Sequence, residues 1–220
     1  MFKKIIGLLR EDKQSIYSDS TQNLCLSEPQ VKQAKTLNAQ ELRRVLDYVA
    51  TRPHAARNRA MILMTYLAGM RVGEVASVRY CDVVDIDGSI RNEIILNASQ
   101  TKGDESRVVF INERLQAELQ AYKSSHRFRS ANDKFFFTQK EPSRGFTPNT
   151  LAQHFHHIYR GVGISGASSH SGRRTFITNL ASKGISVRVL ASLAGHKNIS
   201  VTQRYIDVND DMKRRAVELA

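Results

Sequence analysis

Apolar residues recur at helical spacing along most of this chain. A helix is predicted to begin after Asn38, whose side chain can cap its first turn, and Glu41 completes a capping box three residues later. The apolar positions that follow fall on one face of this helix: Leu42, Val45, Leu46 and Val49. The same spacing predicts further helices at about 54–67, 71–79, 112–123, 148–161, 171–184, 186–194 and 200–205, and a tail helix that begins near Asp210.

The pattern changes period between residues 82 and 111. The dipeptide Asp87-Gly88 is a strong hairpin signal and follows a short apolar stretch at Val84–Ile86. Residues 90–96 and 107–111 are predicted to form two further strands. We therefore expect a mainly α-helical fold with a small three-stranded antiparallel sheet, in which Lys102 lies in the second turn.

The length and the distribution of polar residues predict one domain with a segment on each side. A chain of 220 residues can bury one good core. Residues 1–36 are polar and weakly patterned, so we expect an N-terminal arm there. Residues 37–207 are expected to form the main domain, and residues 208–220 a C-terminal tail helix.

The chain is strongly basic, with 33 Lys and Arg against 21 Asp and Glu, a net charge of +12. This excess favours a polyanionic partner, nucleic acid before an anionic membrane surface, although a basic protein without such a partner stays an alternative. No apolar run approaches the ~20 residues that a membrane span needs. Cys25 and Cys81 have no metal-ligand spacing, so a reduced, cytoplasmic protein is the simpler expectation.

The last quarter of the chain holds residues that can bind a phosphate and offer a nucleophile. His170 and Arg173 are three residues apart and so share a helix face, and a guanidinium can bind phosphate oxygens through two donors. His196 follows Gly195, a residue type that commonly ends a helix. Tyr205 comes nine residues later. A phenol is a poor nucleophile, so it needs a cationic site and a proton acceptor.

Two upstream segments add cations to this set. Gly69-Met70-Arg71-Val72-Gly73-Glu74 places an arginine between two glycines, and Gln100-Thr101-Lys102-Gly103 places a lysine in a tight turn. Taken singly, each residue is more often an ordinary surface or core-edge residue. The order and spacing of the whole set favour a function.

In that order, Arg, Lys, His-x-x-Arg, His and Tyr, the chain resembles the tyrosine recombinases of the phage-integrase family over roughly residues 37–207. The resemblance implies the fold of their catalytic domain. It also implies Tyr205 as a nucleophile that forms a 3′-phosphotyrosyl link and Arg71, Arg173 and His196 as ligands of the phosphate. By the same resemblance Lys102 is a general acid, His170 an acid–base partner, and Glu74 the acidic residue that supports Arg71.

The resemblance also implies double-stranded DNA as the partner, a tetramer on paired sites with a monomer or weak oligomer off DNA, and a nucleoid-associated location without a membrane. Gly172 and Arg174 depart from the leucine and histidine that the family commonly has there, as does Ile206-Asp207 after the tyrosine. The family's usual N-terminal DNA-clamping domain has no room here, so we expect a short member or a fragment.

Two other functions stay open: a type IB topoisomerase, which uses the same chemistry, and a non-catalytic DNA-binding regulator. No cofactor or metal is expected. The histidines at 154, 156 and 157 lack the cysteine or carboxylate spacing of a zinc site.

Overall fold

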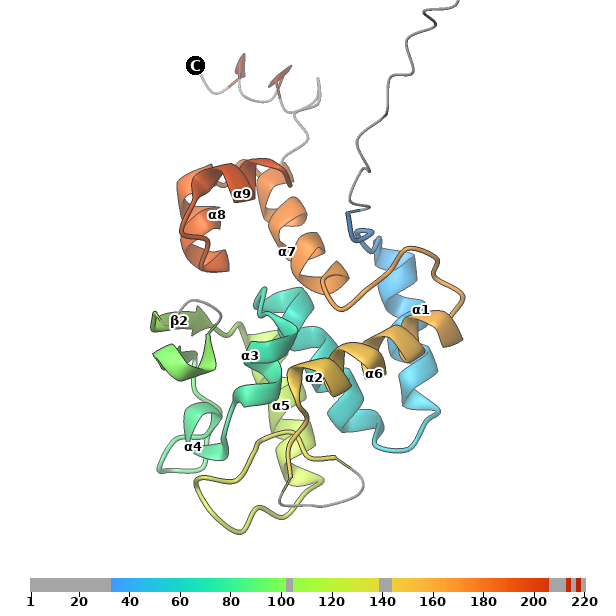
Figure 1. The fold of residues 1–220 in the computed structure, drawn as a ribbon, viewed down its shortest axis with the longest axis vertical. Helices are drawn as coiled ribbons and strands as arrows, with labels where there is room; N and C mark the ends of the chain where they lie inside the picture. Colours follow the sequence, from blue (N-terminus) through green and yellow to red (C-terminus); the bar gives the residue numbers. More distant parts are fainter. Residues whose placement is uncertain (1–32, 102–104, 139–143, 206–212, 215–216, 219–220) are drawn as a thin grey trace, which may run out of the picture. The chain divides into compact units, whose positions relative to one another are not determined.

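A computed structural model of the chain describes residues 33–101, 105–138, 144–205, 213–214 and 217–218 (Figure 1). The internal contacts divide the chain into residues 1–33 and 34–220, and every element below belongs to the second unit. The predicted arm and tail helix therefore fall largely outside the described residues. The elements are α1 (Ala39–Ala50), α2 (Ala55–Leu67), α3 (Val72–Ser77), α4 (Tyr80–Val83), β1 (Glu93–Leu96), a 3₁₀ turn η1 (Ala98–Gln100), β2 (Arg107–Phe110), α5 (Glu113–Ser124), α6 (Pro148–Gly161), α7 (Ser171–Ser182), α8 (Val187–Ala194) and α9 (Ile199–Gln203).

The helices begin and end where local signals in the sequence direct them. The Asn38 side chain accepts a hydrogen bond from the Glu41 backbone N–H, and the Glu41 carboxylate accepts one from the Asn38 N–H, which confirms the predicted capping box. Helix α6 has Thr147 as its N-cap and a proline at its first position. Helix α8 ends at Gly195, which has a φ of 62°.

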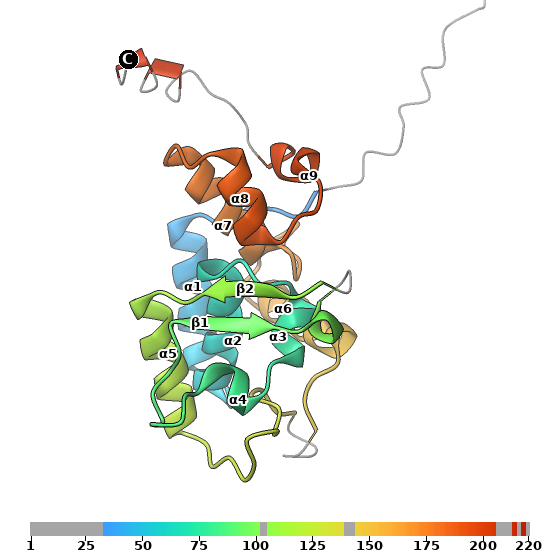
Figure 2. The same ribbon diagram turned by 90° about the vertical axis from the view of Figure 1, so that its left-hand side faces the viewer.

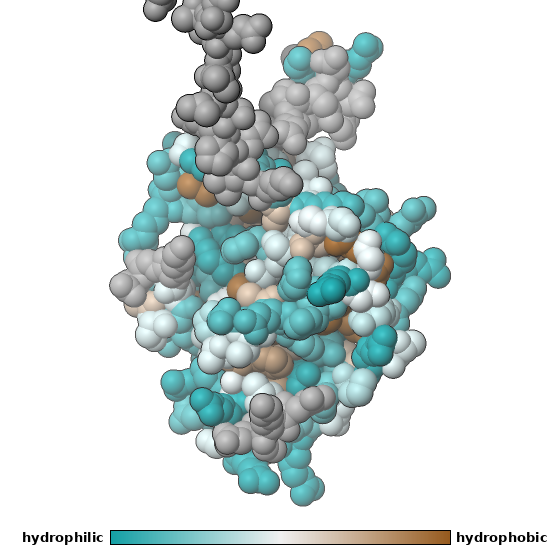
Figure 3. Space-filling model, turned by 45° about the vertical axis from the view of Figure 1, so that its right-hand side comes forward, coloured by the Kyte–Doolittle hydropathy of each residue, from teal (hydrophilic) through white to brown (hydrophobic). Residues whose placement is uncertain are grey.

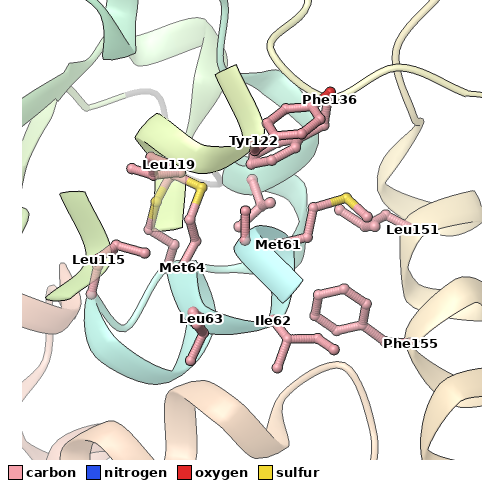
Figure 4. Packing of buried hydrophobic residues seen from close by; sticks show 14 of the residues in the cluster. Met61, Ile62, Leu63, Met64, Leu115, Leu119, Tyr122, Phe136, Leu151 and Phe155 are labelled. Carbon is pink, nitrogen blue, oxygen red and sulfur yellow. The ribbon is translucent and has the colours of Figure 1, made fainter. Parts of the chain in front are cut away.

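Helix α2 forms the centre of the core and packs against α1, α5 and α7 (Figure 1). Because neighbours cover it on several sides, it is buried around most of its circumference, and the consecutive residues Met61, Ile62, Leu63 and Met64 are all fully buried. Figure 4 shows these four residues among side chains of α5 and α6, including Leu115 and Phe155.

The sheet has two strands, not the predicted three. Strands β1 and β2 are antiparallel, with Glu93 opposite Phe110 and Leu96 opposite Arg107 (Figure 2). The turn at Asp87-Gly88 exists, but the segment before it makes a single bridge, from Val84 to Ile90. The first strand fails because residues 80–83 form helix α4 instead. Too few residues then remain before the turn to build a ladder.

Hydrophilic side chains predominate on the face drawn in Figure 3, and apolar ones are scattered there in small patches. Among the described residues, no helix is both long and apolar enough to cross a membrane.

Candidate active site

The carboxylate of Glu74 is the centre of the candidate site. It is 1% exposed and lies in the first turn of α3, for which Arg71 is the N-cap. Its Oε1 accepts hydrogen bonds from Arg71 Nη1 (2.9 Å) and Arg107 Nε (3.0 Å), and its Oε2 from the Arg71 backbone N–H (2.7 Å) and Arg107 Nη2 (2.6 Å). Each carboxylate oxygen therefore accepts two hydrogen bonds, one from Arg71 and one from Arg107.

Burial alone would raise the pKa of Glu74. The hydrogen bonds and the charge of Arg107, with the Arg71 backbone N–H and the charge of Arg173, bring it below its ordinary value instead. Glu74 is therefore an anion at neutral pH, and it holds two guanidinium groups in fixed positions.

Arg107 is a site residue that the sequence reasoning missed. It is the first residue of β2 and shares the inward-facing parity of the buried Val109. A charged residue at an inward strand position is the signal that could have drawn attention to it, because a buried charge needs a partner. That partner, Glu74, is 33 residues away in the chain.

The C-terminal end of α8 receives three guanidinium groups on consecutive carbonyl oxygens. The Leu193 carbonyl accepts from Arg107 Nη1 (2.9 Å), the Ala194 carbonyl from Arg173 Nη2 (2.5 Å), and the Gly195 carbonyl from Arg71 Nη2 (2.8 Å). The last carbonyls of a helix have no partner within the helix and form the negative end of its dipole. This helix end therefore gathers cations from β2, α7 and the start of α3.

The glycine that ends α8 is required twice over. Its φ of 62° lies in the left-handed region, and a Cβ atom there would approach Arg107 Cδ to 2.6 Å. Gly195 is therefore needed both for the left-handed backbone at the end of α8 and for the close packing of Arg107.

Arg173 is deeply buried and donates to two carbonyls from the first turn of α7. Besides Ala194, its Nη1 reaches the carbonyl of Gly69 at 2.6 Å. Burial first, and the charge of Arg71 second, lower the pKa of Arg173 to about 9, so the group is still a cation at neutral pH. Arg71 and Arg173, the two arginines expected to bind the phosphate (the clamp residues), therefore lie at one site.

The close approach of α7 to α2 accounts for Gly172, one of the departures from the family pattern. A Cβ atom at this position would meet Thr65 Oγ1 at 2.2 Å and Thr65 Cβ at 3.0 Å. The larger side chain that the family commonly has would not fit without a shift of α2 or α7. In this chain Gly172 brings the backbone of α7 against α2.

His196 and Tyr205 lie next to the arginine cluster. The rings are stacked, with centroids 5.9 Å apart and an interplanar angle of 20°. His196 Nδ1 is 2.8 Å from Thr202 Oγ1, and the Tyr205 carbonyl accepts a hydrogen bond from Thr178 Oγ1 at 3.4 Å. Burial first, then the charges of Arg173, Arg71 and Arg107, lower the pKa of His196 to about 4, so its imidazole is neutral at neutral pH.

His170 and Lys102 are the remaining predicted site residues. His170 is the exposed N-cap of α7, one turn before Arg173. Lys102 lies outside the described residues; on either side of it, Thr101 Oγ1 donates a hydrogen bond to the Glu105 carbonyl at 2.7 Å.

The histidines of α6 show no zinc-like arrangement. His154 Nε2 is 3.0 Å from Asn58 Oδ1, and its pKa is lowered to about 4 by burial and then by the charge of Arg57. Within the described ranges, no group of three or more His, Cys, Asp or Glu side chains could hold a metal ion.

Comparison with known proteins connects this geometry to one family. Residues 35–212 match the phage integrase family. The chain is 30% identical over 189 residues to tyrosine recombinase XerA of Thermococcus kodakarensis (84% of this chain, 62% of the relative) and 26% identical over 204 residues to tyrosine recombinase XerD of Rickettsia prowazekii (89% and 66%). It therefore spans about three-fifths to two-thirds of the length of these relatives.

Solved structures show the same fold. The crystal structure of XerA recombinase matches with a TM-score of 0.66 and 23% identity (84% of this chain, 64% of that one). The Tn1549 transposon integrase in complex with a circular intermediate DNA matches with a TM-score of 0.68 and 19% identity (87% and 67%). With most of the chain covered by the family match, this protein belongs to the phage integrase family, the tyrosine recombinases.

Proposed function

We propose that this chain cuts and rejoins double-stranded DNA as a site-specific recombinase, with Tyr205 as the nucleophile. The observation that carries the proposal is the gathering of three guanidinium groups at the end of α8, directly beside the stacked rings of His196 and Tyr205. A phosphodiester is the anion such a site would suit, and the phenol is the nucleophile within reach of it.

The proposed step is an in-line displacement at phosphorus. The Tyr205 oxygen forms a bond to phosphorus, and the bond from phosphorus to the 5′ oxygen breaks, which leaves a 3′-phosphotyrosyl link and a free 5′ hydroxyl. The phenol proton passes to His170, and Lys102 donates a proton to the departing 5′ oxygen. A second 5′ hydroxyl reverses the step without ATP, because the phosphodiester energy is stored in the link.

The guanidinium groups can stabilise the charge that develops on the phosphate oxygens. A guanidinium has five N–H donors, and Arg71 uses two of them on Glu74 and Gly195. No other acceptor among the described residues binds the remaining donors, and the Arg71 side chain is 25% exposed. Arg173, with two donors on carbonyls, and the neutral His196 complete the set proposed to surround the phosphate.

The proposal is tested by covalent capture. Nicked duplexes with randomised flanks would be incubated with the protein, and DNA that stays attached under denaturing conditions would be recovered and sequenced. We expect wild-type protein to capture DNA of one sequence class and Tyr205→Phe to capture none while DNA binding persists. Tyr66→Phe is the matched control, because among the described residues the Tyr66 hydroxyl accepts a single long hydrogen bond, from Asn179 at 3.5 Å. Undiminished capture by Tyr205→Phe would contradict the assignment.

The same captured sequence separates recombination from topoisomerase activity. We propose that a duplex with two copies of it is recombined by four protomers that assemble on paired sites. A topoisomerase would instead relax a supercoiled plasmid that lacks the sequence. A regulator without catalytic activity would bind DNA and capture none.

A further inference from the structure

Arg174 lies directly beside the clamp residue Arg173 on α7 but points to a different target. Successive residues on a helix are about 100° apart around its axis, so the two side chains diverge. Arg173 reaches the carbonyls of Gly69 and Ala194, whereas the guanidinium carbon of Arg174 lies 5.6 Å from the centroid of the Tyr205 ring. The chain has this arginine where its family commonly has a histidine.

One face of α7 holds Tyr205 at two points. Thr178 lies one turn beyond Arg174, on the same face of the helix. Its Oγ1 donates to the Tyr205 carbonyl, while Arg174 covers the Tyr205 ring. The backbone and the side chain of the proposed nucleophile are therefore both fixed by the same helix.

Among the residues that the structure describes, no carboxylate forms an ion pair with the guanidinium of Arg174. Its Nε is buried, and in the part of the chain that the structure describes no acceptor reaches it. The other ring against Tyr205 is that of His196, which is neutral at neutral pH. Arg174 is thus the side chain that brings a positive charge to the face of the Tyr205 ring.

A cation over an aromatic face is attracted by the ring, and more strongly where water is excluded. During attack the Tyr205 oxygen loses its proton, and negative charge develops on the phenolate until the bond to phosphorus has formed. We propose that Arg174 is a positioning residue for the nucleophile: its guanidinium orients the Tyr205 ring toward the phosphate and stabilises that developing charge. This inference rests on the proposed function of Tyr205.

The test measures the first-order rate of adduct formation with saturating protein, on the duplex that wild-type protein captures. Arg174→Met removes the charge and keeps most of the volume, and Arg188→Met removes one charge from an exposed position on α8 as the control. We expect Arg174→Met to slow capture roughly 5- to 30-fold and Arg174→Lys to stay within about threefold of wild type. The apparent Kd for DNA should match that of Arg188→Met within about threefold.

Two further measurements distinguish the charge from a merely structural role. Millimolar guanidinium should accelerate capture by Arg174→Ala and leave Arg188→Ala unchanged. In Arg174→His the new imidazole becomes a cation only as the pH falls through its pKa, whose ordinary value is about 6.5, so its rate relative to Arg174→Met should rise as the pH falls and approach equality by about pH 8. Circular dichroism checks each fold, and Arg174→Gln replaces Arg174→Met in both comparisons if the methionine variant does not fold.

Capture by Arg174→Met at the wild-type rate would overturn the inference. The inference would also be overturned if Arg174→Met binds DNA more weakly than Arg188→Met but cleaves at the wild-type rate once saturated. Arg174 would then contact the DNA backbone rather than the nucleophile. If wild-type protein captures no duplex at all, it is the proposed function that fails, and the two results are distinguishable.

Discussion

Substitution of Glu74 is the most direct test of how the arginine cluster is held together. Each oxygen of its carboxylate accepts one hydrogen bond from Arg71 and one from Arg107. Glutamine has the same shape but only one acceptor oxygen. In either orientation of its amide, the NH₂ group would face two N–H donors. Glu74→Gln therefore loses the charge and also creates a donor–donor conflict.

The structure allows a rough magnitude for this loss. The Glu74 side chain is 1% exposed and that of Arg107 10% exposed, so water cannot take over the role of the carboxylate. Removal of one partner from a buried ion pair typically costs about 3–5 kcal/mol. We expect about 3 kcal/mol for Glu74→Gln and about 4 kcal/mol for Glu74→Ala, since the arginine side chains can partly rearrange toward solvent.

The matched control is Glu118→Gln. Glu118 also binds an arginine through two bonds, from Arg59 Nε (2.6 Å) and Nη2 (2.7 Å), but the two side chains are 19% and 35% exposed and no second arginine is involved. Its loss should cost about 1 kcal/mol or less. Urea unfolding followed by far-UV circular dichroism measures both variants. A Glu74→Gln penalty no larger than that of Glu118→Gln would refute the reasoning.

The same variant has a defined pH dependence. The pKa of Glu74 in the folded protein lies below the ordinary value of 4.5, so its contribution to stability is fully present above that value and is lost as the pH falls through the folded-state pKa. The stability difference between wild type and Glu74→Gln should therefore be constant near neutral pH and shrink below about pH 4.5. A difference that stays constant into acid would show that the carboxylate charge is not what is lost.

Three further predictions follow from the site and its surroundings. Lys102→Ala should slow adduct formation on an ordinary duplex. The variant should regain most of the rate on a duplex whose 5′-bridging oxygen is replaced by sulfur, because a thiolate leaves without a general acid. Equal slowing on both duplexes would show that Lys102 is not the general acid. Gly172→Ala should destabilise the fold by about 1–3 kcal/mol despite the better helix propensity of alanine, because its Cβ would lie 2.2 Å from Thr65 Oγ1. Adding Thr65→Ala to this variant should recover part of the lost stability, measured by thermal unfolding. DNA affinity should fall steeply with salt, by about 0.9 in log–log slope for each phosphate contact, and Arg71→Ala should reduce that slope by about one; a flat profile in a filter-binding titration would argue against a DNA partner for a chain of charge +12.

The elements with local signals could be predicted from the sequence, and those that depend on context could not. The capping box at Asn38 and the proline at the start of α6 place both helices to within a residue or two. The three-stranded sheet was wrong because the strand predicted at Val84–Ile86 directly follows residues 80–83, which form helix α4, and the apolar pattern does not distinguish a short helix from a strand there. The tertiary setting, with α4 packed against β1, decides between them.

The candidate site shows the same division. Tyr205, Arg173 and His196 could be proposed because their spacing resembles a family pattern. Arg107 could not, because its partners are Glu74, 33 residues away, and the Leu193 carbonyl, 86 residues away. A backbone carbonyl is present at every position, so its use as an acceptor leaves no trace in the sequence. Contacts of this kind become visible only once the fold has brought α3, β2 and α8 together.

The choice of acceptors explains how this site can hold several cations and still attract an anion. Arg71, Arg107 and Arg173 repel one another, and their charges help to lower the pKa of His196. Carboxylates in equal number would hold them in place, but they would also cancel the positive charge and repel a phosphate. Within the described part of the chain, the three arginines bind one carboxylate, Glu74, and otherwise backbone carbonyls, at Gly69 and at the end of α8. A carbonyl dipole fixes the orientation of a guanidinium without neutralising it, so the cluster keeps a net positive charge beside Tyr205, where the proposed function requires a phosphate to bind.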